Sequence, residues 1–247
     1  MQDVSAFQEN LSQLRHAQKS SSGAPAYSRF VNRPLGRLLA AGARVLGLTP
    51  TQVTLLSGAT TLAGIVVLAV LPPHLATALL VTGLLVLGYA LDSADGQLAR
   101  LTRTGSLAGE WLDHFFDALK AVALHAAVLV CWFRYFDVRE GWYLVPLVFA
   151  TVSSGFFFGV VGADLLRRIA GQGAPTAAPR AVRSSPLYAL AVLPADYGFL
   201  CIAFLLLWIP DAFVVLYTAL AAINAVVLAL SAVRWYRSIR ALDARTA

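Results

Sequence analysis

The sequence predicts an all-α integral membrane protein with six transmembrane helices and an N-terminal amphipathic juxtamembrane helix. Hydrophobic residues make up 58% of the 247 residues and charged residues only 13%, with a mean hydropathy of +0.70. Soluble domains carry about a quarter charged residues, so lipid is the expected solvent for most of this chain. The apolar residues also gather in six runs, each near or above the roughly 20 residues that a helix needs to cross a bilayer.

The segments outside the apolar runs differ in character. Residues 1–26 are polar and end in a Ser/Gly/Pro-rich stretch, so we expect a mobile N-terminus. Residues 27–47 interleave arginines with leucines, a pattern typical of a basic amphipathic helix on the cytoplasmic membrane surface. We therefore expect one six-helix membrane domain over residues 48–240, followed by a short tail over residues 241–247.

The six spans are expected at 50–71, 75–101, 106–135, 142–168, 187–209 and 211–235. Thr49 is a plausible N-cap for the first span, and Pro50 would occupy its first helical position, where proline is favoured. Residues 171–186 are rich in Gly, Pro and Ala and predict a loop between the fourth and fifth spans.

The basic residues predict the orientation of the chain. With the N-terminus in the cytoplasm, sixteen of the 19 lysines and arginines lie inside, Arg134 and Arg139 lie outside, and Lys120 lies within a span. This is a positive-inside distribution, so the basic residues should contact membrane lipids rather than nucleic acid. We expect the chain in the cytoplasmic membrane of a bacterium or archaeon, with both termini inside.

Residues 92–117 concentrate negative charge between two apolar flanks. On helices, their aspartates fall on two faces, because residues three or four positions apart are neighbours. A short turn near residues 104–105 would join the two helices as an antiparallel pair, so both faces converge near the cytoplasmic end. The faces carry Asp92 and Asp95 on one helix, and Gly109, Asp113 and Asp117 on the next.

Four carboxylates inside a bilayer need compensation, because each charge costs about 2.5–3.5 kcal/mol on insertion scales. Arg100 and Lys120 can neutralise two at most. Divalent ions are therefore expected, and oxygen ligands favour Mg2+ or Mn2+. Two such ions on four carboxylates would form the pair that commonly clamps a phosphoryl or pyrophosphate group. Gly96, Ala99 and Gly109 leave room beside them for a flat ligand such as a nucleotide base.

These residues carry a resemblance. The pattern Asp92-x2-Asp95-Gly96-x2-Ala99-Arg100-x8-Gly109-x3-Asp113-x3-Asp117 resembles the complete signature of the CDP-alcohol phosphotransferase family, with every position and gap kept. The resemblance implies a transferase of substituted phosphate groups (the EC 2.7.8 type) in phospholipid biosynthesis. Such an enzyme moves a substituted phosphate, often phosphatidyl, from a CDP-linked donor such as CDP-diacylglycerol to an alcohol acceptor and releases CMP. It also implies a homodimer with a cytoplasmic active site.

The resemblance assigns roles residue by residue. It implies that two Mg2+ or Mn2+ ions are held by Asp92, Asp95, Asp113 and Asp117. It implies that Asp117 is also the catalytic general base, which suits an alcohol because a hydroxyl is a poor nucleophile near neutral pH. It implies that the CDP moiety is bound by Gly96, Ala99, Arg100 and Gly109.

The acceptor alcohol stays open. The segment Pro194-Ala195-Asp196-Tyr197 has no arginine where members that use phosphorylated polyols often have an arginine–acid–arginine run. "LDHFFDAL" resembles choline and ethanolamine phosphotransferases, whereas "SRFVNRPLGRLL…TPTQVT" is similar to members that use inositol phosphates. Candidate acceptor or phosphate residues are Lys120, Arg167, Arg168 and Asp196.

Each of these candidates also has a structural interpretation. Lys120 could be a snorkelling lysine. Arg167 and Arg168 could mark topology alone, with Asp164 as a helical neighbour that pairs with one of them. His114 should point away from both Asp113 and Asp117 and make a structural contact.

Three alternative functions remain. One is phosphocholine or phosphoethanolamine transfer from a CDP-amino alcohol to a lipid alcohol. A second, from another class, is an intramembrane ion or solute transporter; it is disfavoured because the acidic groups gather at one depth rather than along a route. A third is an inactive scaffold, which the unsubstituted signature disfavours.

Overall fold

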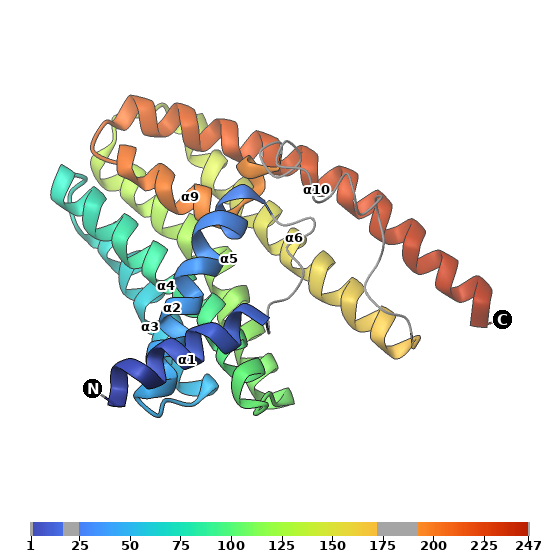
Figure 1. The fold of residues 1–247 in the computed structure, drawn as a ribbon. Coiled ribbons are helices and arrows are strands. Elements are labelled where there is room, and N and C mark those ends of the chain that lie inside the picture. Colours follow the sequence, from blue (N-terminus) through green and yellow to red (C-terminus); the bar gives the residue numbers. More distant parts are fainter. Residues whose placement is uncertain (1, 17–24, 172–191, 247) are drawn as a thin grey trace.

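The computed structural model describes residues 2–16, 25–171 and 192–246, and every regular element in them is helical. Figure 1 shows a bundle of long helices crossed by two N-terminal ones. The elements run in the order α1 Gln2–His16, η1 Ser28–Asn32, α2 Arg33–Val45, α3 Pro50–Val70, α4 Leu75–Thr102, α5 Leu107–Tyr135, η2 Glu140–Tyr143, α6 Leu144–Ile169, η3 Leu193–Ala195, α9 Tyr197–Ala203, η4 Phe204–Leu206 and α10 Pro210–Thr246.

Five helices of the described residues are long and apolar enough to cross a membrane: α3, α4, α5, α6 together with η2, and α10. The chain is therefore an integral membrane protein of helical type. Four of the expected spans coincide with α3 to α6 within a few residues. The expected span 211–235 corresponds to α10, which continues to Thr246 and so includes most of the expected tail.

The expected span 187–209 is not confirmed. Its first residues, 187–191, lie outside the described part of the chain. The rest forms the short apolar helix Tyr197–Leu206, preceded by the separate turn η3. Asp196 caps α9 by accepting a hydrogen bond from the Gly198 backbone, which fixes where this helix begins.

Local sequence explains where α3 begins. The Thr49 hydroxyl accepts a hydrogen bond from the Gln52 backbone at 3.3 Å, and the Gln52 side chain accepts one from the Thr49 backbone at 2.8 Å. This capping box, with Pro50 at the first helical position, satisfies backbone groups that a helix end leaves unpaired. The predicted N-cap at Thr49 is confirmed.

The α4–α5 hairpin turns over residues 103–106. Arg103 adopts a left-handed conformation (φ 56°), which ends α4. Ser106 then caps α5, its hydroxyl accepting a hydrogen bond from the Gly109 backbone at 3.0 Å. The two halves of the acidic motif are therefore joined by a tight, capped turn.

The N-terminal helices cover one side of the bundle. α2 packs against α4 through Gly36, Ala40 and Ala41, while Leu35 and Leu38 are exposed on its other face. α2 lies within the expected range 27–47, and its position at the membrane surface stays a prediction. Within residues 1–26, where we expected mobility, the structure describes α1, which packs on α2 and contributes to a small apolar cluster.

The main core lies between α3, α4, α5, α6, α9 and α10. Its largest fully buried side chains include Trp132, Phe204, Phe213 and Tyr217. In Figure 1, α6 and α10 run side by side and extend beyond the other helices toward the C-terminus. The acidic ends of α4 and α5 lie beside this core.

Candidate functional site

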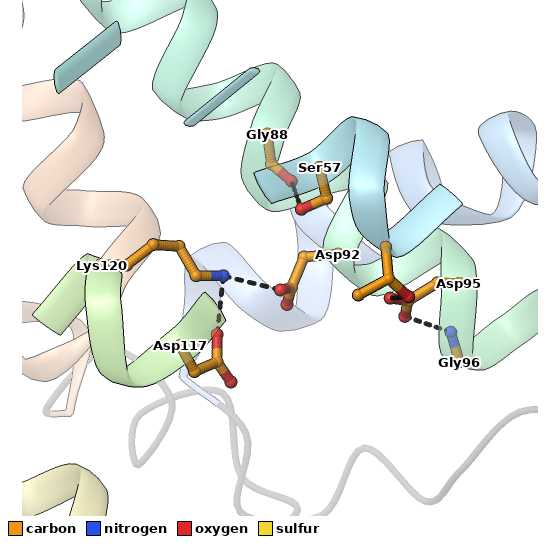
Figure 2. A network of polar contacts seen from close by, with 8 residues as sticks. Ser57, Gly88, Asp92, Asp95, Gly96, Asp117 and Lys120 are labelled. Atoms are coloured by element: carbon orange, nitrogen blue, oxygen red, sulfur yellow. Dashed lines mark hydrogen bonds and ion pairs between the residues drawn. The ribbon is translucent and has the colours of Figure 1, made fainter. Parts of the chain in front are cut away.

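Lys120 joins the two helices of the acidic motif. Its ammonium lies 2.7 Å from Oδ1 of Asp92 on α4 and 2.6 Å from Oδ1 of Asp117, one turn away on α5. Figure 2 shows the lysine between the two carboxylates. Only 6% of Lys120 is exposed, so its charge is matched by the two acids rather than by water. It does not snorkel to the surface.

Asp95 lies three residues further along α4 than Asp92 and apart from this ion pair, as Figure 2 shows. Oδ2 accepts a hydrogen bond of 2.5 Å from the Thr54 hydroxyl of α3, and Oδ1 accepts one from the Gly96 backbone. The side chain is buried. Thr54 therefore orients one of the predicted metal ligands, a role that the sequence analysis missed.

Asp113, His114 and Asp117 form a compact group on α5. Each can offer one ligand atom so that all three atoms lie within 4.8 Å of one another. His114 makes the expected structural contact, edge to face with Phe157 of α6 at 6.2 Å between ring centroids, but lies nearer the two aspartates than expected. Its Nε2 also lies 3.8 Å from Glu110, which is four residues earlier and therefore on the same face of α5.

All four predicted carboxylates lie at one end of the hairpin. Asp113 is close enough to Asp92, Asp95 and Asp117 for electrostatic repulsion between the carboxylates. The donors are carboxylate oxygens, with one imidazole nearby, and this set suits Mg2+ or Mn2+. Asp113 and Asp117 therefore suit the metal that the motif implies, whereas Asp92 and Asp95 are not part of this close group in the described residues. Lys120 neutralises part of the charge of Asp92 and Asp117.

The signature residues line two cavities. The first, which we call the Gly96 cavity, has a volume of about 740 Å3 and also reaches His114 and Arg168. Its signature residues are Asp95, Gly96, Ala99, Arg100, Gly109 and Asp113. A methyl group placed on the Cα atom of Gly96 would meet only the Arg100 guanidinium, at 3.4 Å, so the glycine leaves open space.

The second cavity, which we call the Asp196 cavity, has a volume of about 490 Å3. It is lined by the other two signature residues, Asp92 and Asp117, together with Lys120 and Asp196. Asp113 and Asp117 are one helical turn apart but line different cavities. Both cavities are therefore bordered by the same acidic stretch of α5.

The two arginines at the end of α6 have different positions. Arg167 is buried, donates a hydrogen bond to Ser238 of α10 at 2.8 Å, and lines neither cavity. Arg168 is exposed and forms ion pairs with Glu110 at 2.7 Å and with Asp164 at 2.5 Å. The suggested Asp164 pairing is thus seen for Arg168, which also ties α6 to the start of α5 at the Gly96 cavity.

Asp196 is brought to the site from a distant part of the sequence. Its Oδ2 accepts a hydrogen bond from the Ser28 backbone at 2.8 Å, 168 residues away in the chain. Its Oδ1 accepts from Gly198 at 2.9 Å and faces the Tyr89 hydroxyl at 3.5 Å. The site therefore contains α9 and the N-terminal segment as well as the acidic hairpin.

Comparison with known proteins agrees with this geometry. The family model of CDP-alcohol phosphatidyltransferase matches residues 47–234, which covers 188 of the 247 residues and includes every signature position. No curated protein matches the chain. The matched region contains α3 to α6 and α9, which supply most of the lining of both cavities. The chain therefore belongs to the CDP-alcohol phosphatidyltransferase family, whose members are transferases that move a phosphatidyl group from a CDP-alcohol.

Proposed function

We propose that this chain transfers a substituted phosphate, in the first instance phosphatidyl from CDP-diacylglycerol, to the hydroxyl group of an alcohol and releases CMP. The observation that carries the proposal is the division of the eight signature positions between two cavities that share the α5 carboxylates. One cavity can hold the nucleotide and the other an acceptor, with Asp113 and Asp117 between them. Phosphocholine-type or phosphoethanolamine-type transfer from a CDP-amino alcohol would use the same chemistry with the roles of the substrates changed.

The Gly96 cavity is the proposed nucleotide site. Gly96 and Ala99 present almost no side chain to it, which allows a flat base to approach the α4 backbone. Arg100 supplies a guanidinium, which binds phosphate oxygens in a fixed fork geometry. Gly109 opens the facing side at the start of α5.

Asp117 is the proposed general base. The acceptor oxygen forms a bond to the phosphorus that carries the lipid, and the bond from that phosphorus to the oxygen of CMP breaks. The electron pair leaves with CMP, and the hydroxyl proton goes to Asp117. Since Lys120 contacts Oδ1 of Asp117, we assign the proton to Oδ2. Lys120 thereby keeps the carboxylate oriented until the proton arrives.

Divalent ions complete the proposed site. Two Mg2+ or Mn2+ ions held by Asp92, Asp95, Asp113 and Asp117 would supply positive charge to the pyrophosphate when bound. Thr54 and the Gly96 backbone orient Asp95 for this role, because ligand carboxylates are themselves held by hydrogen bonds.

We further propose that the site faces the cytoplasm, that membrane lipids surround the long helices, and that the chain forms a homodimer. The positive-inside distribution of arginines supports the orientation. The η2–α6 span is the least buried of the five spans, because only 17% of its most apolar 18-residue stretch is buried against the rest of the described chain. It therefore has an exposed face that lipid or a second copy can cover. Mass determination of the protein in detergent would test the dimer.

The function is tested with purified protein in liposomes that contain radiolabelled CDP-diacylglycerol and Mg2+. The acceptors are serine, choline, ethanolamine, glycerol phosphate, inositol phosphate and lipid alcohols. We expect CMP release that depends on one of these alcohols. The proposal would be contradicted if none of these alcohols supported CMP release with any CDP-alcohol donor.

A further inference from the structure

Asp196 is a buried acid outside the signature. Only 3% of the residue is exposed, and it lines the Asp196 cavity together with Asp117. Its hydrogen-bond partners are two backbone N–H groups and the Tyr89 hydroxyl. None of the ion pairs found in the described residues includes it. A buried carboxylate without a cation is costly, so a positively charged ligand is its natural partner.

Aromatic rings form much of the same cavity wall. Tyr89 and Tyr197 meet edge to face with their ring centroids 5.2 Å apart, and both side chains contact the cavity next to Asp196. Three phenylalanines of α6 complete the aromatic lining: Phe149, Phe156 and Phe157. Aromatic faces attract organic cations, and this attraction strengthens where water is excluded. A carboxylate among such rings is the arrangement that recognises an ammonium group.

The charges of the cavity favour the same kind of ligand. Asp92 and Asp117 share Lys120 and are proposed metal ligands, so Asp196 is the carboxylate of the described lining whose charge nothing else in the proposed site offsets. An acceptor that carries a phosphate would add two negative charges beside Asp196. An ammonium group would instead offset the charge that no described residue offsets.

We propose that the Asp196 cavity binds the acceptor alcohol, and that this acceptor is an amino alcohol whose ammonium group is held by Asp196 and the surrounding rings. The inference rests on the proposed function and names its acceptor class. The hydroxyl oxygen of the amino alcohol forms the new bond to phosphorus, its proton goes to Asp117, CMP leaves with the electron pair, and the nitrogen takes no part. Asp196 is thus a specificity residue, not a member of the reacting set.

The first test compares acceptors that differ in charge. Purified protein in liposomes with CDP-diacylglycerol and Mg2+ receives choline, ethanolamine, glycerol phosphate, or dimethylbutanol, the uncharged carbon isostere of choline. We expect an amino alcohol to support CMP release with a kcat/KM at least about tenfold above that of the isostere or the phosphate, which corresponds to the ~1.4 kcal/mol of one cation contact.

The second test removes the charge of Asp196. Asp196→Asn keeps an oxygen that can cap α9, because Asn is as good an N-cap as Asp. We expect KM for the amino alcohol to rise about tenfold or more, while kcat and KM for the donor change less than about threefold. Asp211→Asn is the matched control, since Asp211 is an exposed acid in the first turn of another helix, α10. It should leave all constants unchanged.

A third measurement needs no variant. Choline should raise the Tm of the wild-type protein, and dimethylbutanol at the same concentration should not.

A neutral or phosphorylated acceptor used in preference to amino alcohols would overturn the inference. So would an Asp196→Asn variant that weakens binding of the donor rather than the acceptor. In both cases CMP release continues and the proposed function stands. CMP release with no acceptor at all would sink both.

Discussion

The Lys120 ammonium lies 2.7 Å from Oδ1 of Asp92, although 28 residues separate them and they belong to facing helices. The same ammonium contacts Asp117 at 2.6 Å. A single buried cation therefore fixes the distance between two carboxylates that we assign to the reaction. Several measurable consequences depend on this arrangement.

Replacement of Lys120 by Met should destabilise the metal-free protein. Removal of one partner of a buried ion pair typically costs about 3–5 kcal/mol, because the other charge stays buried and unpaired. Thermal unfolding in detergent with a chelator measures this loss. Mg2+ should raise the Tm of the variant more than that of the wild type, because the ion would replace the lost charge. Lys120→Arg keeps the charge and serves as the control; equal Mg2+ shifts in all three proteins would contradict the prediction.

Asp117→Asn should slow CMP release about 100-fold or more, because a positioned general base contributes roughly 10²–10⁴ in rate. Donor binding should weaken far less than the rate falls, since the Gly96 cavity is lined by other residues and three of the four proposed metal ligands remain. Initial rates with a saturating acceptor, together with binding of labelled CDP, separate the two effects. Asp137→Asn is an exposed, isosteric control outside both cavities. A wild-type rate in Asp117→Asn would refute the assignment of the base.

Removal of divalent metal should abolish CMP release, and Mg2+ or Mn2+ should restore it. Asp113→Asn should weaken Mn2+ binding measured by electron paramagnetic resonance, because it removes one ligand oxygen from the group that Asp113 forms with Asp117. This readout does not depend on turnover. Asp137→Asn again serves for comparison. Activity that survives exhaustive chelation would remove the metal from the proposal.

Gly96→Leu should raise KM for the CDP donor about tenfold or more without loss of thermal stability. A side chain there points into open space beside Arg100 and would occupy the Gly96 cavity. Gly88→Ala is the opposite case, because its methyl group would lie 3.2 Å from the backbone nitrogen of Thr61 on α3. Crowding of this kind costs about 1–3 kcal/mol. The expected signature is lower stability for Gly88→Ala with an unchanged donor KM.

Cysteine labelling tests the orientation. Cys131 and Cys201 are fully buried, so the wild-type chain should not react with a membrane-impermeant maleimide. In intact cells, Arg139→Cys between α5 and η2 should react, and Thr104→Cys in the α4–α5 turn should react only after permeabilisation. The reverse pattern would place the acidic hairpin on the outer side.

Local rules were sufficient for much of the site. Helical periodicity placed Asp92 and Asp95 on α4 and Asp113 and Asp117 on α5, and the short turn made them meet. The capping signals of Thr49 and Pro50 located the start of α3. Each of these inferences needs only helical periodicity, a capping signal or one short turn between consecutive helices.

Contacts between distant residues could not be predicted in this way. Thr54 meets Asp95 across 41 residues, and Ser28 meets Asp196 across 168, so no spacing rule relates them. Hydropathy also indicated one span over 187–209, because an apolar average does not register the turn at η3 or the helix start that Asp196 fixes. The imidazole of His114 lies nearer the aspartates than expected, because helical periodicity gives only the position of the Cα atom. The side-chain torsions decide where the imidazole lies.

The tight turn over residues 103–106 has a consequence for biogenesis. Because α4 and α5 are consecutive and so closely joined, they can pass from the translocon into lipid as one helical hairpin. Lys120 travels in that hairpin with Asp92 and Asp117, so one of their two negative charges is offset within the hairpin itself. This internal ion pair lowers the cost of moving the segment out of the translocation channel and does not need the C-terminal half of the chain.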